Sequence, residues 1–189
     1  MPLTFIDANV LFRMFAASPQ TIRKYRENGS CGRESLDYAI ELLLRLGEGG
    51  YSTSEIALLE TVGVASRLGG KAKAEELFKA VTLQEGLRVL ETRSLAYPLS
   101  FELVLSYQLE ARDSLHLSVA ILNSVSKLIT SDADFADRTE LMIESVKHEG
   151  LQLPGFIKTM YQIQDEEADL LEKRLRRTIS LLSISKCPA

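Results

Sequence analysis

The stretch Leu3-Thr4-Phe5-Ile6-Asp7-Ala8-Asn9 sets the fold class that we expect. Its apolar run predicts a short buried strand over residues 3–6, which Asp7 ends. Further runs that predict strands occur at residues 87–90 and 126–130, and residues 51–53 are predicted to be a second strand or a very short extended piece. Because helical patterns separate these runs, the chain is typical of an α/β protein with a central, mostly parallel sheet.

The remaining elements follow from apolar spacing and from capping residues. Helices are expected over residues 36–46, from the S-x-x-E capping box at 52–55 to Gly69-Gly70, and over 71–81, 101–109, 113–122 and 156–182. In the second of these helices, Ile56, Leu59 and Val62 are expected to be buried, and Asp113 is expected to be the N-cap of the fifth. The last strand is predicted over residues 141–146, and 17–35 is predicted to be a loop.

In this interpretation the chain has two parts. Residues 1–150 form the α/β domain, and residues 151–189 form a helical C-terminal extension that begins around Pro154-Gly155. One face of the long final helix is apolar, so it must pack on the domain or on a second copy of the chain. Because two-fold dimers are the commonest assemblies, a homodimer is the expected oligomer.

Composition excludes several kinds of protein. The 26 acidic and 22 basic residues give a formal net charge of −4, which by itself argues against a protein that coats nucleic acid. With two cysteines and two histidines, a disulfide framework and a His-rich zinc site are not expected. The chain has no apolar run near the ~20 residues of a membrane helix, and Asp7 comes too early for a signal peptide. A cytoplasmic protein with no membrane partner is expected.

Four acidic side chains are expected to meet at the carboxyl edge of the sheet. Asp7 and Asp132 follow two predicted strands, and Glu60 and Asp113 lie early in helices that begin at the same edge. Ionised carboxylates repel one another, so hard cations would stabilise such a group, and all-oxygen ligation indicates Mg²⁺ or Mn²⁺. Each acid alone also has a structural interpretation, as a cap, a turn residue or a solvent-facing side chain.

Four segments resemble the four motifs of PIN domains, the fold of the VapC-type toxin ribonucleases. They are Phe5-Ile6-Asp7-Ala8-Asn9-Val10-Leu11, Ser54-Glu55-Ile56-Ala57-Leu58-Leu59-Glu60, Ala111-Arg112-Asp113-Ser114-Leu115-His116-Leu117-Ser118-Val119-Ala120 and Leu128-Ile129-Thr130-Ser131-Asp132-Ala133-Asp134-Phe135. The resemblance covers about residues 3–146, with the motifs in the order of the family. It implies a PIN-like three-layer α/β/α fold, with the long C-terminal helix as an addition.

The resemblance also implies a Mg²⁺- or Mn²⁺-dependent endoribonuclease that hydrolyses RNA phosphodiester bonds. By position in the motifs, Asp7, Glu60, Asp113 and Asp132 are its catalytic residues and metal ligands, with Asp134 as a fifth acid. Some members of the family are the toxin of a toxin–antitoxin pair. RNA and an antitoxin protein are therefore the partners that the resemblance implies.

Several residues beside these motifs are candidates for RNA binding. They are Asn9, Arg13, Arg112, Thr130 and Ser131. Residues 13–33 contain five basic side chains and one acidic side chain, so phosphate is expected to meet the chain there. A solvated loop is the alternative interpretation of that segment. The distribution of the charges, more than their sum, therefore indicates RNA.

Two other functions fit part of the pattern. A catalytically silent PIN-like module would bind RNA or protein without cleaving it, but the presence of all four acids argues against this. A phosphatase of the haloacid dehalogenase type would need a second Asp where Asn9 stands, and Lys127 lies at the wrong end of its strand. His116, one turn after Asp113, is expected to pack in the core rather than to bind a ligand.

Overall fold

A five-stranded sheet lies at the centre of the computed structural model, which describes residues 2–188. The strands are β1 (Leu3–Ile6), β2 (Tyr51–Ser54), β3 (Leu87–Leu90), β4 (Val125–Thr130) and β5 (Ser183–Lys186). Their order is β3-β2-β1-β4-β5, and every neighbouring pair is parallel. The chain moves outward from β1 to β3 and then returns to the other side of β1. The strand order therefore reverses between β1 and β4.

Side chains on the two central strands alternate between two cores. Phe5 and Leu128 belong to the core on one face of the sheet, and Ile6 and Ile129, the next residues, belong to the core on the other face. Because both faces are buried, apolar residues are adjacent in these strands, as in Phe5-Ile6 and Leu128-Ile129, and do not alternate with polar ones. These apolar residues are the reason that the sequence predicts both strands.

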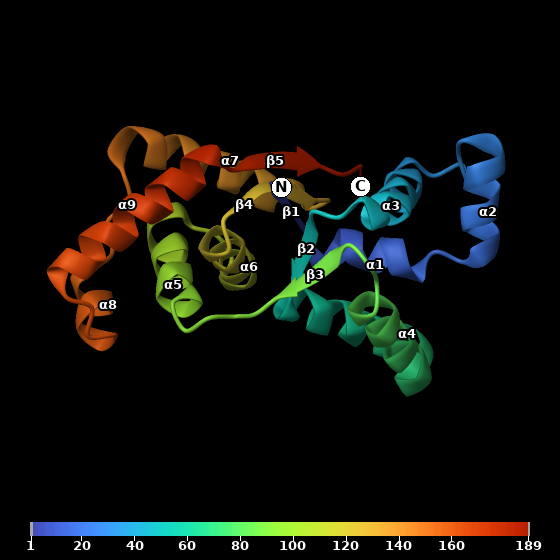
Figure 1. Cartoon of the computed structure of the whole chain (residues 1–189), viewed down its shortest axis with the longest axis horizontal. Helices are drawn as coiled ribbons and strands as arrows, with labels where there is room; N and C mark the ends of the chain where they lie inside the picture. Colours follow the sequence, from blue (N-terminus) through green and yellow to red (C-terminus); the bar gives the residue numbers. More distant parts are fainter. Residues whose placement is uncertain (1, 189) are drawn as a thin grey trace.

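Helices cover both faces of the sheet, as Figure 1 shows. One layer consists of α5 (Ala96–Tyr107), α6 (Ala111–Leu122), α7 (Ala133–Glu149) and α9 (Asp165–Leu181), and the other of α1 (Ala8–Ala16), α3 (Glu34–Arg45) and α4 (Glu55–Thr82). The helix α2 (Pro19–Asn28) and the short helices η1 (Leu46–Glu48) and α8 (Gly155–Met160) complete the fold. The predicted three-layer α/β/α arrangement is confirmed.

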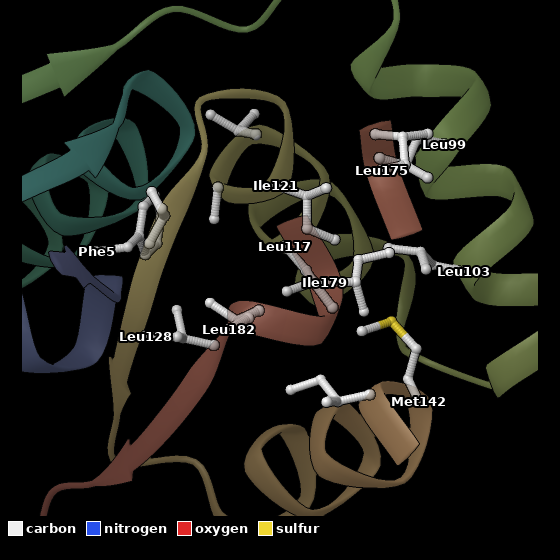
Figure 2. Close-up of a cluster of buried hydrophobic side chains, with 14 of the residues drawn as sticks. Phe5, Leu99, Leu103, Leu117, Ile121, Leu128, Met142, Leu175, Ile179 and Leu182 are labelled. Atoms are coloured by element: carbon white, nitrogen blue, oxygen red, sulfur yellow. The ribbon is translucent and has the colours of Figure 1, made fainter. Parts of the chain in front are cut away.

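The segment after residue 150 contributes to the core of this fold. Leu175, Ile179 and Leu182 are buried against side chains of α5, α6 and α7 (Figure 2). Beyond them, β5 adds an edge strand beside β4. The prediction of one helix over 156–182 was wrong in its extent, because the segment forms α8 and α9 with a break between them.

Two further element predictions were wrong. The strand predicted over 141–146 is part of α7, where Met142, Ile143 and Val146 are buried while Leu141 is 72% exposed. This spacing is that of a helix with one buried face. The predicted loop over 17–35 contains α2, which begins after the N-cap Ser18 and buries no residue. A helix without a buried face has no apolar period to reveal it.

Capping also differs from the prediction in two helices. Ser54, not Ser52, is the N-cap of α4, and its hydroxyl accepts from Ala57 N–H at 3.0 Å. The buried face of this helix also differs from the prediction, since it contains Ala57, Leu58 and Thr61 while Leu59 is 68% exposed. Asp113 lies inside the first turn of α6 and does not cap it. None of the helices within residues 2–188 is long and apolar enough to cross a membrane.

Candidate active site

Two acids follow the neighbouring strands β1 and β4, where the strand order reverses. Asp7 caps α1, with one carboxylate oxygen accepting from Ala8 N–H at 2.8 Å. Its other oxygen accepts from the Thr130 hydroxyl at 2.9 Å. The same hydroxyl accepts from Asp132 N–H at 3.0 Å, and Asp132 in turn caps α7. Thr130, which is fully buried, therefore links the two acids. In open α/β sheets such a crevice is the usual place for a ligand.

The third acid, Glu60, is held by a buried histidine. His116 on α6 lies between Ser54 and Glu60, with 3.2 Å from Nδ1 to Ser54 Oγ and 3.2 Å from Nε2 to Glu60 Oε2. Ser54 Oγ already accepts from Ala57 N–H, so its own proton is free to donate to Nδ1. In that tautomer, the Nε2–H group donates to Glu60. His116 is buried in the core, as expected, but it also contacts Glu60, which the sequence did not predict.

The fourth acid, Asp113, is buried beside an arginine. Arg112 Nε lies 3.7 Å from Asp113 Oδ1 and 3.6 Å from Glu60 Oε1, so one guanidinium contacts two of the acids. Burial, together with the charges of Asp7 and Asp132, raises the pKa of Asp113 to about 6, and the Arg112 guanidinium opposes this shift. The carboxylates therefore lie close enough to affect one another.

The Asp7 carboxyl responds to its surroundings in the same way. Burial raises its pKa, while His116, the Thr130 hydroxyl and the Ala8 amide oppose the shift, and the charge of Glu60 adds to it. Asp7 therefore lies within electrostatic range of Glu60, and Asp113 within range of Asp7 and Asp132. The structure brings the four predicted acids to one edge of the sheet.

The donor set of this edge fits a hard divalent cation in its chemistry, since all four acids offer carboxylate oxygens. Within residues 2–188, however, no three His, Cys, Asp or Glu side chains already form a ligand group. Arg112 provides a positive charge beside Glu60 and Asp113 instead. A cation would have to compete with this guanidinium for their oxygens.

Some candidates from the sequence lie away from these acids. Arg13 donates to the carbonyl of Pro188 at 2.9 Å, so its side chain is directed to the C-terminal segment. Asp134 pairs with Arg138 at 2.8 Å on the exposed side of α7. The basic segment 13–33 runs into α2, which projects beyond α1 at one end of the molecule (Figure 1). That segment therefore leads away from Asp7.

The other candidates remain near the acids. Asn9 is exposed on α1 and lines a pocket that also contains Glu60 and Arg112. Ser131 is half-buried in the turn between Thr130 and Asp132. Arg67, which sequence reasoning missed, lines the same pocket. The sequence could have indicated Arg67, because it follows Glu60 by seven residues, or about two helical turns, and so lies on the same face of the helix.

Comparison with known proteins gives a family and two similar folds. The family model of the PIN domain matches residues 4–141. Mycobacterium tuberculosis VapC20, a Sarcin-Ricin loop cleaving toxin, superposes with a TM-score of 0.52 at 19% identity, over 71% of this chain and 93% of that chain. A chain of a toxin–antitoxin complex from Klebsiella pneumoniae has a TM-score of 0.48 at 19% identity, over 70% of this chain and 90% of that chain. No curated protein matches the sequence.

Proposed function

Since the chain belongs to the PIN domain family, we propose that it is a metal-dependent endoribonuclease that hydrolyses RNA phosphodiester bonds. The observation that carries the proposal is the convergence of Asp7, Glu60, Asp113 and Asp132 where the strand order reverses. Four carboxylates at one place are stabilised by cations, and PIN domains generally use divalent metal ions. The oxygen donors favour Mg²⁺ or Mn²⁺.

The four acids would hold the metal, which supplies an activated water and stabilises charge on the phosphodiester. The other residues of the site position these acids. Thr130 fixes one oxygen of Asp7, and His116 fixes one oxygen of Glu60. Both contacts are buried or partly buried, so the carboxylates are held in place before a ligand arrives. Arg112, which is half-exposed, can turn from the acids to the phosphate of the substrate.

The test is cleavage of structured and unstructured RNAs with Mg²⁺ or Mn²⁺ added. We expect Asp7→Asn and Asp113→Asn each to reduce the rate by roughly 10²-fold or more, the range for losing a group that stabilises transition-state charge. Asn retains the capping geometry of residue 7, so the fold is expected to survive. Asp169→Asn, at an exposed position on α9, is the control.

Unchanged cleavage by both variants would overturn the proposal. Protein that binds RNA but cuts none with either ion would identify a silent binding module instead. Turnover of a chromogenic phosphate monoester without cleavage of RNA would identify a phosphatase.

We also propose that the protein is the toxin of a toxin–antitoxin pair. Its support is the family together with the fold shared with VapC20, which is described as a toxin. Expression of the intact chain should then arrest growth, and expression of Asp7→Asn should not. Equal growth with both chains would contradict the toxin assignment and leave the ribonuclease assignment to the cleavage assay.

A further inference from the structure

A pocket of about 450 Å³ opens beside the acids, between α1 and α4. The side chains and the glycine that matter for its chemistry are Asn9, Phe12, Glu60, Gly63, Arg67 and Arg112. Its volume lies within the ~300–1,000 Å³ of pockets that take small organic ligands. The polar and apolar groups of its wall are mixed, so it can bind a ligand that has both kinds of surface.

The pocket is continuous with the proposed site of cleavage. Glu60 is both one of the four acids and part of the wall, and Arg112 contacts Glu60 and Asp113. Asn9 lies two residues after Asp7 on the first turn of α1. A ligand held in this pocket would therefore have one end at the carboxylates.

The groups on the wall match the parts of a nucleotide. Arg67 is exposed and lies about two turns along α4 from Glu60, so it and Arg112 offer two guanidinium groups for phosphate. Phe12 is half-buried and offers an aromatic surface to a base. The amide of Asn9 can both donate and accept, as the edges of bases and ribose hydroxyls require.

A second pocket of similar volume, between α5 and α7, lacks this chemistry. Its arginine, Arg138, already pairs with Asp134 and donates to the carbonyl of Gln108 at 2.8 Å. Asp134 and Asp137 make its wall acidic. The wall of the pocket between α1 and α4 carries two arginines and one carboxylate, so it is the better match for phosphate.

We propose that the pocket between α1 and α4 binds the nucleotide next to the scissile phosphate of the RNA, with its base against Phe12 and its phosphate between Arg67 and Arg112. This inference rests on the proposed ribonuclease function. It assigns the substrate a position, since one nucleotide in the pocket directs the neighbouring phosphodiester to the four acids.

The test uses the full chain in EDTA, with the four nucleoside 5′-monophosphates, the free nucleosides and inorganic phosphate as probes, followed by NMR chemical shifts. We expect at least one monophosphate to bind more tightly than its nucleoside or phosphate alone. Arg67→Gln should raise its Kd about tenfold, the effect of losing one charge-assisted contact. Arg88→Gln, at an exposed position on β3, should leave the Kd unchanged.

Gly63→Leu is the sharper variant, because it is designed to fill the pocket without disturbing the fold. A Cβ at Gly63 would meet no atom within 4 Å, and leucine favours a helix more than glycine does. We therefore expect loss of monophosphate binding with an unchanged or higher melting temperature. Equal binding by the wild type and Gly63→Leu would overturn the inference.

The cleavage assay separates this inference from the proposed function. Suppose that Asp7→Asn loses RNA cleavage while Gly63→Leu still binds the monophosphate. This result supports the ribonuclease and overturns the pocket assignment. Monophosphate binding that Gly63→Leu abolishes, in a protein that cleaves no RNA, would show a nucleotide pocket but would overturn the ribonuclease and, with it, the position of that nucleotide beside a scissile phosphate. If both hold, Arg67→Gln should raise KM for RNA more than it lowers kcat.

Discussion

Arg112 contacts two of the four acids, Glu60 at 3.6 Å and Asp113 at 3.7 Å. A metal ion bound by those acids would take up the same carboxylate oxygens. The guanidinium therefore stabilises the metal-free site and competes with the ion. Because the Arg112 side chain is 54% exposed, solvent weakens this competition.

We predict that Arg112→Gln binds Mn²⁺ more tightly than the wild type when RNA is absent. The expected gain is about two- to fivefold, which corresponds to the roughly 0.5–1 kcal/mol of a partly exposed ion pair. Calorimetric titration of Mn²⁺ into the RNA-free protein measures it, with Arg138→Gln as the control because its partner Asp134 lies elsewhere. Weaker binding by Arg112→Gln would instead show that Arg112 orients the ligands.

The placement of the four candidate acids at one edge of the sheet could be predicted from the sequence, and their supporting contacts could not. Asp7 and Asp132 each follow an apolar run, and parallel strands bring such ends to one edge. The contacts of Thr130 with Asp7 and of His116 with Glu60 join residues 123 and 56 positions apart. No local pattern encodes such a pairing, so only the folded chain reveals it.

Helix α4 contains a break that depends on one glycine. Gly70 has φ 72° and ψ −171°, a conformation that residues with a Cβ rarely adopt. The sequence prediction of two helices that meet at Gly69-Gly70 agrees with this break. Gly63, on the same element, has ordinary helical geometry and open space around it.

We predict opposite effects of alanine at these two glycines. Gly70→Ala should lower the free energy of unfolding by about 1–3 kcal/mol because of backbone strain. Gly63→Ala should raise it by about 0.5–1 kcal/mol because alanine favours the helix. Urea denaturation of both variants measures the two values. A lower stability of Gly63→Ala than of Gly70→Ala would contradict this account of the break.

Helix α5 carries a buried carboxyl that makes stability depend on pH. Glu102 is 6% exposed and accepts from the Ser106 hydroxyl at 2.6 Å. Burial raises its pKa above the ordinary value of 4.5, the Ser106 hydroxyl opposes the shift, and Glu172 on α9 adds to it. A carboxyl with a higher pKa in the folded state binds more protons there than in the unfolded state. Its contribution to stability therefore decreases as the pH rises from 4.5 through the folded value.

We predict that Glu102→Gln raises the melting temperature at pH 7 and that the gain shrinks as the pH falls toward 4.5. Glutamine stays neutral and can still accept from Ser106, so the variant removes the buried charge alone. Thermal unfolding followed at several pH values measures the gain. A gain of the same size at every pH would show that the charge of Glu102 is not its cause.

The errors in the element predictions share one physical cause, which is that short segments do not show what they will pack against. Residues 141–143 are three consecutive apolar residues, but Leu141 faces solvent while Met142 and Ile143 face the core, as in a helix. Strand β5 has the sequence Ser183-Ile184-Ser185-Lys186 with exposed ends, so it lacks the apolar run of a central strand. It forms because it pairs with β4 across the fold.

At the scale of the whole molecule, the C-terminal segment contributes side chains to the main core. The apolar face of α9 is covered by the core of its own chain, with Leu175, Ile179 and Leu182 at most 5% exposed. A homodimer would therefore use a surface other than this face of α9. The homodimer stays a prediction, which sedimentation velocity can test. For the same reason we propose that the C-terminal extension, of which the structure describes residues 151–188, packs on the domain of residues 1–150 and is required for its folding.

We predict that a chain ending at residue 150 does not fold cooperatively. Truncation of one buried Leu or Ile side chain to Ala costs about 2–5 kcal/mol, and the net stability of a domain is about 5–15 kcal/mol. Loss of Leu175, Ile179 and Leu182 together with β5 is therefore expected to exceed the stability of the domain. Circular dichroism during thermal unfolding measures whether the truncated chain has a cooperative transition. If residues 1–150 unfold cooperatively at the midpoint of the full chain, the C-terminal segment is dispensable.

A pair of point variants tests the same dependence without a deletion. Ile179→Ala, in the core, should lower the free energy of unfolding by about 2–5 kcal/mol. Leu181→Ala, two residues later and 67% exposed, should change it by less than about 0.5 kcal/mol. Equal effects of the two variants would show that α9 does not pack as the structure places it.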